Sequence, residues 1–549
     1  MQQIIADAVH AALESLRASW PALEPDRVAF TVQPSSRPEH GDLQTNAAMI
    51  AAAQLGARDK RAVAGDLAAA LTFAPGTIAR VEVAGPGFLN FFVDDRYYQD
   101  LVARVVAADD DWGRLTLGTG QSVNVEFVSA NPTGPLTVGH GRNAVLGDVV
   151  ARLHEWAGYK VTREYYFNNA GRQMHLLGES VRARYRELLG APLELPEGGY
   201  QGGYIADIAA TLRAEQGDEL AAADEAVFRG AAERAIFAQI EATCARLGIS
   251  FDRFFNEQSL YDSGAIQAVL DQLRTHDLAY EADGATWLRG EPLGLDKDRV
   301  LVKSSGEPTY RLPDMAYHLD KLGRGYETVI DVFGADHIDT CQEVLAVVRA
   351  LGGDTERVKV MLYQFVTLTR DGQQVKMSTR QATYETLDGL LDEVGADAVR
   401  YFFALRSPTS HMEFDLALAL RQANDNPMYY VQYGHARINS ILRREEAAAL
   451  AAEPLDLALL TDEAERALIV AVSRLPEVLA RALAEHEPHR LPTYAAEVAT
   501  AFHQFYDRCP ILSAETRALA RARLELAQAA RICLRNVLAM LGVSAPERM

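Results

Sequence analysis

Two short polar stretches contain residue types that could hold phosphate groups. The first, NPTGPLTVGH at residues 131–140, lies where a strand-like run gives way to a helix-like run, and it ends in Gly139 and His140. Backbone N–H groups at a helix N-terminus attract phosphate oxygens, and Gly139 would let a ligand approach the backbone. The His140 side chain could donate a hydrogen bond to a phosphate. Taken alone, this pattern more often marks an ordinary polar loop before a helix.

The second stretch, VKMSTR at residues 375–380, follows a strand and a turn. It combines the cations Lys376 and Arg380 with the hydroxyl of Ser378, and Met377 lies between them. A cationic loop with hydroxyl groups is suited to gripping a pyrophosphate as it leaves. As an isolated motif, this stretch would more often be an exposed basic turn.

The elements around these stretches alternate between strand and helix over residues 113–410. Strands are predicted at residues 122–130, 160–167, 328–337 and 358–369. After His140, apolar residues recur at helical spacing as far as Trp156, and Gly158 supplies a C-terminal stop. This order predicts an α/β fold with a Rossmann-like doubly wound parallel sheet, into which residues 180–250 are inserted. Ligands of such sheets bind at the carboxyl ends of the strands, where residues 131–140 lie.

The two flanking regions have different textures. Residues 1–112 predict a small α+β module, with an antiparallel strand pair around Gly85-Pro86-Gly87. Residues 411–549 are almost wholly helix-patterned, and a helical bundle is predicted there. One helix of that bundle stacks five residues on its buried face: Leu526, Ala530, Cys533, Val537 and Leu541.

Composition is that of a globular protein. Hydrophobic residues make up 48% and charged residues 23% of the 549 residues, unlike a disordered chain. The net charge of -21 argues against indiscriminate binding to nucleic acid or anionic membranes, but it leaves a local basic groove open. The four cysteines are far apart and without metal-ligand spacing, which favours a reduced, cytoplasmic protein. No apolar run of roughly 18 or more residues predicts a membrane span, and the first residues read as an amphipathic helix.

The two phosphate-type stretches, in this order and on this kind of sheet, resemble the ATP-binding motifs of class I aminoacyl-tRNA synthetases. Longer stretches narrow the resemblance to the arginyl-tRNA synthetase family. They are HGDLQTNAAM, AGPGFLNF, ANPTGPLTVGHGRNAVLGD, FNNAGRQ, DKDRVLVKSSGEPTYRLPDMAYHLDK, GADH, DNPMYYVQYGHARI and GVSAPERM. The resemblance covers essentially the whole chain.

The resemblance implies roles for individual residues. ATP would be bound by Thr137, Gly139, His140, Gly334, Asp336, Lys376, Met377, Ser378 and Arg380, among which His140, Lys376 and Ser378 would act on the phosphates during catalysis. Arginine would be bound by Asn131, which holds its α-amino group, and by Glu257, Tyr310, Asp314 and His337. Carboxylates suit that task, because a guanidinium is best bound in planar, bidentate geometry.

A third set would meet the nucleic acid. Tyr429, Tyr430, Gln432 and Arg437 combine aromatic, amide and cationic side chains on one predicted helix, which suits stacking on unpaired tRNA bases with phosphate contacts. An aromatic seam buried against the sheet region is the alternative interpretation. Asp148, in the helix after His140, is predicted to be structural.

The implied activity is ATP-dependent attachment of L-arginine to tRNA(Arg) by a monomeric enzyme that needs bound tRNA for activation. Magnesium is expected as MgATP, with no dedicated protein metal site. Thr137 stands where the family often has histidine, Gly134 where it commonly has lysine, and Thr379 where it has a second lysine, and we hypothesise that Arg380 compensates. Three alternatives stay open: a synthetase for another amino acid, a non-catalytic tRNA-binding paralogue, and an unrelated nucleotide-binding protein.

Overall fold

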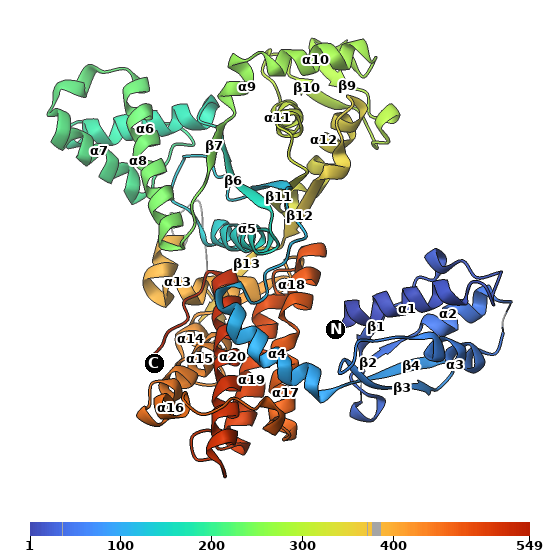
Figure 1. Cartoon of the computed structure of the whole chain (residues 1–549). Helices are drawn as coiled ribbons and strands as arrows, with labels where there is room; N and C mark the ends of the chain where they lie inside the picture. The colour runs from blue at the N-terminus through green and yellow to red at the C-terminus, as the bar shows by residue number, and fades with distance from the viewer. Residues whose placement is uncertain (36, 57, 371, 376–385) are drawn as a thin grey trace.

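The computed structural model describes residues 1–35, 37–56, 58–370, 372–375 and 386–549. Three regions follow one another along the chain (Figure 1). A small N-terminal module lies to one side, a parallel sheet with its helices occupies the upper part of the view, and a helical bundle lies below the sheet. The N-terminal module and the sheet region both contact the bundle, which therefore joins the molecule together.

The N-terminal module is α+β, as the sequence predicts. Its four-stranded sheet has the order β1-β2-β4-β3 with antiparallel neighbours throughout, and β3 and β4 form the predicted hairpin, in which Ala84 pairs with Phe88. The elements are α1 (Gln2–Leu16), β1 (Val32–Pro34), β2 (Leu43–Thr45), α2 (Ala47–Gln54), α3 (Lys60–Ala70), β3 (Ile78–Ala84) and β4 (Phe88–Val93). The next helix, α4 (Asp95–Ala108), packs on the bundle, where Arg466 reaches back to Asp42 at 2.8 Å and Asp95 at 3.0 Å.

A five-stranded parallel sheet forms the centre of the second region, which confirms the predicted fold class. Its order is β12-β11-β5-β6-β7. The strands are β5 (Ser122–Glu126), β6 (Lys160–Phe167), β7 (Arg253–Asn256), β11 (Thr328–Gly334) and β12 (Val358–Tyr363). Because β6 lies on one side of β5 and β11 on the other, the chain direction across the sheet switches at β5, where ligands bind in such folds.

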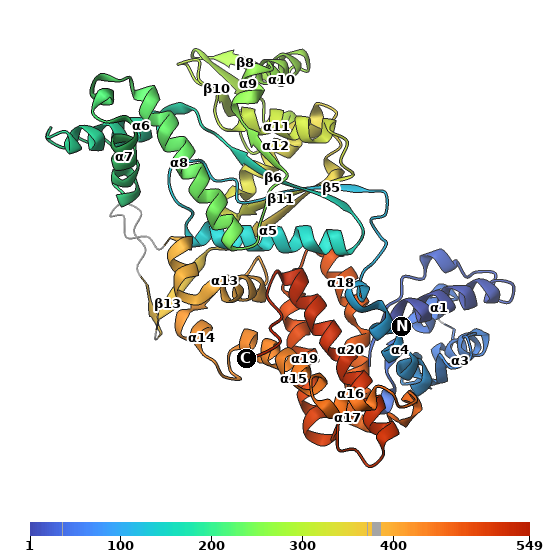
Figure 2. The same cartoon turned by 60° about the vertical axis from the view of Figure 1, so that its left-hand side comes forward.

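Helix α5 (Val138–Trp156) connects β5 to β6 and lies between the sheet and the bundle (Figures 1 and 2). Gly147 allows this close packing, because a Cβ atom there would lie 2.3 Å from the side chain of Phe127. Two excursions extend from the sheet. One contains α6 (Gly171–Leu188), α7 (Gly203–Gln216) and α8 (Glu225–Arg246), between β6 and β7, so the predicted insertion begins near residue 171 instead of 180.

The other excursion, between β7 and β11, was not predicted. It carries a three-stranded antiparallel sheet of order β10-β9-β8, and its helices cover one face of the central sheet. The elements are α9 (Gln258–Asp262), α10 (Ala265–Thr275), β8 (Ala279–Ala282), β9 (Ala285–Leu288), β10 (Arg299–Val302) and α11 (Arg311–Gly323). Helix α12 (Ile338–Ala350) then joins β11 to β12.

The predicted strand at residues 358–369 is two strands in different sheets. Strand β12 ends at Tyr363, and Gln364 and Phe365 belong to no strand. The next strand, β13 (Val366–Arg370), joins a second small sheet of order β14-β13-β15. The buried guanidinium of Arg142 holds this break, since its Nη1 donates to the carbonyl of Gln364. The partners are β14 (Gln373–Gln374) and β15 (Met412–Asp415), of which β15 runs parallel to β13.

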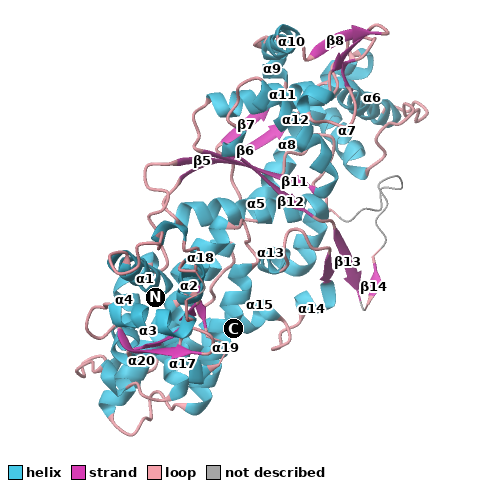
Figure 3. Cartoon of the chain, turned by 90° about the vertical axis from the view of Figure 1, so that its right-hand side faces the viewer, coloured by secondary structure: helices cyan, strands magenta, loops and turns pink. Residues whose placement is uncertain are grey.

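The C-terminal region is the predicted helical bundle, and Figure 3 shows the contrast between its helices and the strands above. Leu526, Ala530, Cys533, Val537 and Leu541 are all fully buried on one helix, as predicted. Helix α13 (Leu387–Leu405) packs on α5, and the helices that follow it are α14 (Leu416–Leu420), α15 (Pro427–Leu442), α16 (Glu445–Leu450), α17 (Glu463–Ser473), α18 (Leu475–Ala484), α19 (Arg490–Arg508) and α20 (Arg517–Leu541). Within the described residues, every helix is too short or too polar to cross a membrane.

Candidate functional site

The chain leaves β5 in an unusual backbone conformation. Val128 and Ser129 have φ values of 67° and 46°, in the left-handed region that a β-branched residue such as valine rarely adopts. The Asn143 side chain holds this turn, because it accepts the Val128 N–H and donates to the carbonyl of Val332 at 2.8 Å. Asn143 thus joins α5 to the ends of β5 and β11, and residues 131–137 emerge at the carboxyl edge of the sheet.

His140 is fixed by its own helix start. Thr137 is the N-cap of α5, and Thr137 and His140 form a reciprocal capping box. The His140 Nδ1 accepts the Thr137 N–H at 3.1 Å, and burial lowers the pKa of His140. A neutral ring whose Nδ1 is an acceptor carries its hydrogen on Nε2. His140 therefore presents an N–H donor, as a phosphate ligand requires, whereas the Thr137 hydroxyl caps the helix.

The chain that follows the second phosphate-type stretch contacts the first stretch. Thr386 forms an isolated antiparallel bridge with Thr137, and the Leu387 N–H donates to the Leu136 carbonyl at 2.8 Å. The predicted residues Lys376, Met377, Ser378 and Arg380 lie outside the described residues. The chain that follows them nevertheless returns to the loop that leads into α5.

A cavity of about 720 Å³ opens beside this loop. The 131–140 loop lines one side through Asn131, Thr137 and His140, and the glycine-rich segment 198–204 of the insertion lines the other. The Tyr204 hydroxyl donates to the Thr133 carbonyl at 2.8 Å, which fastens the two sides together. Sequence reasoning missed this segment, although its paired glycines in EGGYQGGY are a visible signal of close backbone approach.

Gly134 belongs to the same contact. A Cβ atom there would lie 3.0 Å from the Tyr204 hydroxyl oxygen, so a longer side chain would require Tyr204 to shift. The lysine that the family commonly carries at this position would compete with Tyr204 for space.

Glu257 and Asn131, predicted as arginine ligands, are connected through one residue. Asn168 donates its side-chain amide to Glu257 at 2.8 Å and its backbone N–H to the Asn131 side chain at 2.9 Å. Tyr166 donates its hydroxyl to the other oxygen of Glu257 at 2.5 Å. Burial raises the pKa of Glu257, although these two hydrogen bonds oppose the shift. The ends of β5, β6 and β7 thus meet in one polar corner.

Asp314 completes this corner from α11. Burial raises the pKa of Asp314 to about 7; the neighbouring His318 opposes the shift, and the negative charges of Glu126 and Glu257 add to it. Among the described residues, neither Asp314 nor Glu257 forms an ion pair with a basic side chain. Two neighbouring carboxyl groups that form no ion pair offer a site for a positively charged ligand.

The remaining predicted ligands lie around this corner at the surface. Tyr310 is the N-cap of α11, one turn before Asp314, and it is 74% exposed. Gly334 ends β11, and the exposed side chains of Asp336 and His337 follow it, with 3.8 Å between the His337 Nε2 and the Asp336 Oδ2. The structure therefore places these residues at the sheet edge but shows no direct contact of Tyr310 or His337 with Asp314 or Glu257.

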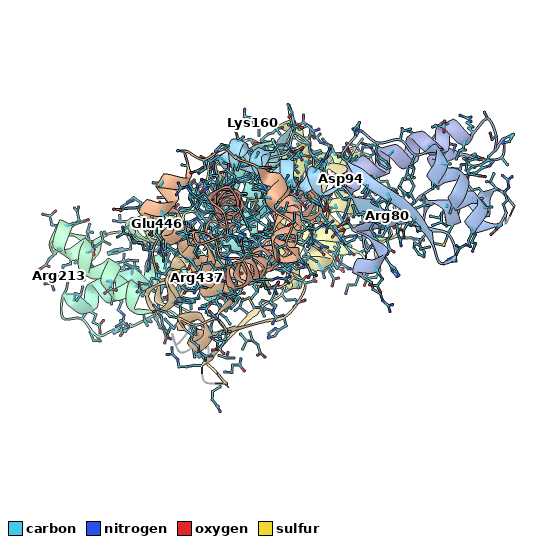
Figure 4. All side chains as sticks on the ribbon, turned by 60° about the horizontal axis from the view of Figure 1, so that its bottom comes forward. Arg80, Asp94, Lys160, Arg213, Arg437 and Glu446 are labelled. Carbon is cyan, nitrogen blue, oxygen red and sulfur yellow. The ribbon has the colours of Figure 1, made fainter. Side chains whose placement is uncertain are left out.

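An aromatic cluster on α15 and α19 contains three of the four predicted tRNA ligands. Tyr429 stacks on Tyr433 with 5.8 Å between ring centroids, Tyr430 contacts His503, and the Arg437 guanidinium lies 4.8 Å from the Tyr433 ring. A cavity of about 700 Å³ lies among them. Figure 4 labels Arg437 on the bundle, between Arg213 on the insertion and Arg80 on the N-terminal module.

Gln432 differs from the expectation. It is 5% exposed, and its side-chain amide donates to Asp397 at 2.9 Å and to the Ser544 carbonyl at 3.0 Å. The cavity is lined by Tyr429, Tyr430, Tyr433 and Arg437 of the same helix, and not by Gln432. Gln432 is therefore a packing residue that holds the end of the chain, and sequence spacing could not show this.

Asp148 is structural, as predicted. It is 1% exposed and forms ion pairs with Arg152, Arg163 and Arg400. In the part of the chain that the structure describes, no cluster of three or more His, Cys, Asp or Glu residues could hold a metal ion.

Family models match three successive parts of the chain. Residues 1–93 match the arginyl-tRNA synthetase N-terminal domain, residues 102–403 the class I tRNA synthetase (R) catalytic domain, and residues 431–549 the DALR anticodon-binding domain. These matches follow the order of the module, the sheet region and the bundle.

Whole-length relatives agree. A protein of Salinibacter ruber named arginine–tRNA ligase is 50% identical over 545 residues, which cover 96% of this chain and 97% of the relative. One of Desulfotalea psychrophila with the same name is 47% identical, with 95% of both chains covered. The Thermus thermophilus arginyl-tRNA synthetase structure superposes on the fold with a TM-score of 0.77, at 23% identity and full coverage of both chains. By its catalytic domain and by these relatives, the chain belongs to the arginyl-tRNA synthetase family of class I aminoacyl-tRNA synthetases.

Proposed function

We propose that this chain carries out the arginine–tRNA ligase activity of its family at the carboxyl edge of the central sheet, between the 131–140 loop and the Glu257–Asp314 corner. The observation that carries the proposal is that corner: two carboxyl groups with raised pKa values, one of them almost fully buried, without a basic partner among the described residues. An arginine guanidinium supplies the missing positive charge and presents N–H groups that both carboxylates can accept.

The reaction has two steps. In the first, an oxygen of the arginine carboxylate attacks the α-phosphorus of ATP; the bond to the bridging oxygen breaks, and arginyl-adenylate and pyrophosphate form. In the second, a ribose hydroxyl at the 3′ end of the tRNA attacks the arginyl carbonyl and releases AMP. No side chain needs to become a nucleophile, so the protein contributes positioning and charge stabilisation.

His140 and the first turn of α5 support the first step. The ring can donate from Nε2 because Nδ1 already accepts from Thr137, and free N–H groups at the helix start attract phosphate oxygens. The 131–140 loop connects this phosphate site to Asn131, which lies in hydrogen-bonding contact with the Glu257 corner through Asn168. We assign ATP to Thr137, Gly139, His140, Gly334 and Asp336, and to Lys376, Met377, Ser378 and Arg380, which lie outside the described residues.

The remaining predicted residues are assigned to arginine and to tRNA. We assign arginine to Asn131, Glu257, Tyr310, Asp314 and His337. For the tRNA we keep Tyr429, Tyr430 and Arg437, whose rings and guanidinium surround an open cavity on the bundle. Base stacking on aromatic rings tolerates different sequences, and a nearby guanidinium adds attraction for phosphate.

The broader setting is part of the proposal. Mg²⁺ would enter as MgATP and would supply positive charge to the phosphates, held by the nucleotide and not by a dedicated protein site. The three regions, 1–112, 113–410 and 411–549, serve tRNA contact, catalysis and anticodon binding. The enzyme acts in the cytoplasm, and it is a monomer. Light scattering on a size-exclusion column would check the monomeric state.

One experiment tests the activity. ATP–pyrophosphate exchange is measured with each amino acid in turn, with and without tRNA(Arg), and again with EDTA in excess over Mg²⁺. Of the amino acids, we expect only arginine to support exchange, and only when tRNA(Arg) is present. EDTA should abolish that exchange. Exchange with lysine or another amino acid, or none under any condition, would overturn the proposal.

A further inference from the structure

A layer of charged side chains lies buried between α11 and the central sheet, beneath Asp314. Asp331, Glu126 and Glu164 occupy one row across the neighbouring strands β11, β5 and β6, since Asp331 pairs with Glu126 and Glu126 with Glu164. All three are at most 2% exposed. Parallel strands in register point paired residues to the same face, so the three carboxyl groups face α11 together.

Basic side chains from α11 and its C-cap meet this row. The Lys321 ammonium bonds both Glu126 and Asp331, and it is fully buried. The Arg324 guanidinium grips Glu164 with both Nη atoms, at 2.5 Å and 2.9 Å. Glu126, Glu164 and one oxygen of Asp331 therefore each have a basic partner. The other oxygen of Asp331 is left for His318.

His318 is held by an acceptor on each side. Its Nδ1 lies 2.7 Å from the carbonyl oxygen of Asp314, one helical turn back, and its Nε2 lies 3.0 Å from Oδ2 of Asp331. Because a carbonyl and a carboxylate can only accept, both ring nitrogens must carry hydrogen, and the ring is an imidazolium. Burial alone would lower the pKa of His318, but the bonded carboxylate of Asp331 raises it above its ordinary value.

We propose that His318 is a positioning residue for the arginine substrate: as an imidazolium fixed by Asp331, it holds the first turn of α11 and places a positive charge beneath the Asp314 carboxyl group. The proposal rests on the function assigned above to Asp314. His318 touches neither ATP nor arginine in it. It acts through Asp314, which is the group that meets the guanidinium.

The surroundings of Asp314 explain why it needs such support. Other titratable or charged groups face it or the His318–Asp331 pair from every packed element: Tyr317 and Lys321 on α11, Glu126 on β5, Glu164 and Tyr166 on β6, Glu257 after β7, and Cys341 on α12. Carboxyl groups outnumber basic groups in this set. Without the positive charge of His318, Asp314 would hold its proton to a higher pH and would bind a guanidinium less well.

His154 offers a matched control. It is also a buried helical histidine whose Nδ1 lies 2.7 Å from the carbonyl oxygen one turn back, at Val150. No carboxylate bonds its other nitrogen among the described residues, and burial lowers the pKa of His154 to about 4. It lies on α5, near the bundle, and we place it in no ligand site. His154→Gln therefore removes a similar buried ring without touching the charge beneath Asp314.

The kinetic test compares His318→Gln with His154→Gln in arginine-dependent, tRNA-supported pyrophosphate exchange. For His318→Gln at pH 6 we expect the KM for arginine to rise about tenfold while the KM for ATP stays near wild type, since below its pKa a carboxyl group loses about tenfold of its ionised form for each unit that the pKa rises. The pH at which the arginine KM begins to rise on acidification should also move upward. An unchanged arginine KM and pH profile, or a parallel rise in both KM values as in a general packing defect, would overturn the proposal.

A second measurement uses only the wild-type protein, so it does not depend on whether a variant folds. Wild-type protein carrying ¹⁵N only in histidine is examined by NMR at pH 8, in the absence of ATP and tRNA. We expect a ring with two protonated nitrogens, assigned to His318 by its contacts to α11, and a neutral ring for His154. A neutral His318 ring would refute the proposal even if arginine exchange is normal, whereas absent arginine exchange with an imidazolium at His318 would refute only the proposed function.

Discussion

Arg400 lies within 2.5 Å of Asp148, and the same guanidinium donates to the carbonyls of Leu247 and Leu541, both at 2.7 Å. These four residues come from α13, from α5, from the end of the insertion and from the last residue of α20. The buried side chain of Arg400 therefore joins α5 to the insertion and to the bundle. Gly542 leaves room for it, because a Cβ atom there would lie 2.3 Å from the guanidinium.

Replacing Arg400 should destabilise the whole chain. Arg400→Gln leaves Asp148 buried with fewer cations, and removal of one partner of a buried ion pair costs about 3–5 kcal/mol. Urea unfolding monitored by circular dichroism measures the loss. Arg349→Gln, which removes an exposed arginine paired with Glu356 at 3.7 Å, is the control and should change stability by less than about 0.5 kcal/mol. Equal stability of the two variants would show that the junction is dispensable.

The arginine corner should respond to loss of charge. Glu257→Gln or Asp314→Asn should raise the KM for arginine about 10- to 100-fold, because a hydrogen bond to a charged group contributes about 1.5–3 kcal/mol. The KM for ATP should change little, since neither residue lies on the 131–140 loop. Steady-state pyrophosphate exchange gives both values. The control is Glu356→Gln, an exposed acid paired with Arg349 before β12, which should leave both KM values unchanged.

The raised pKa of Asp314, about 7, sets a pH dependence in the wild-type enzyme. Arginine needs the ionised carboxylate, so its apparent KM should be constant above about pH 8 and rise by up to about tenfold per unit below pH 7. Bound arginine stabilises the ionised form, so the increase in melting temperature caused by arginine should be larger at pH 8 than at pH 6. A KM for arginine that is the same at pH 6 and pH 8 would show that Asp314 does not titrate in this range.

His140 should act on the phosphates and not on arginine. His140→Ala removes the Nε2 donor, and loss of one donor to developing charge typically lowers kcat about 100-fold or more. Thr137→Ala should cost about 1 kcal/mol of stability through loss of the N-cap, beyond its effect on ATP binding, with Thr137→Ser retaining the cap. Rapid-quench measurement of adenylate formation gives the rate effect, and thermal unfolding of the same variants gives the stability effect. If His140→Ala formed adenylate at the wild-type rate, its assignment to ATP would fail.

The aromatic cluster should govern tRNA affinity. Tyr429→Ala should raise the KM for tRNA by about 10-fold or more, since stacking of one base on an aromatic ring contributes about 1–3 kcal/mol. Arg437→Ala should also weaken binding and reduce the salt dependence by about one phosphate contact. Aminoacylation at varied tRNA and salt concentrations gives both quantities. Arg349→Ala is a charge-matched control on α12, and equal effects from it would point to net charge in place of a specific surface.

Local signals predicted some elements well and others not at all. β6 spans residues 160–167 as predicted, because an alternating β-rich run there is bounded by Gly158. The break after β12 has no glycine or proline, and it depends on Arg142, more than two hundred residues away in sequence. Gln432 is likewise buried by Ser544, 112 residues later. Patterns along the chain report local backbone preference, whereas these positions are decided by partners that only the folded chain brings near.

The candidate site divides in the same way. Glu257, Asp314 and His140 were predicted through the family resemblance, and their residue types match the ligand chemistry. His318 and Asp331 carry no such signal, since the need for a cation beneath Asp314 arises only when the strands pair. The segment 198–204 was detectable by its glycines, but its partner, the loop at Thr133, was not.

The bridge between Thr137 and Thr386 has a consequence for how mutational data on the two phosphate motifs should be interpreted. Val375, the first residue of the second motif, donates its N–H to the Leu368 carbonyl, and Thr386, the next residue that the structure describes, lies against the cap of α5. Substitutions at Thr137 therefore act on a backbone contact with the segment that follows the second motif. Free-energy changes measured separately for Thr137 and for Thr386 should not sum to that of the double variant, and only a double-mutant cycle will divide the contribution between them.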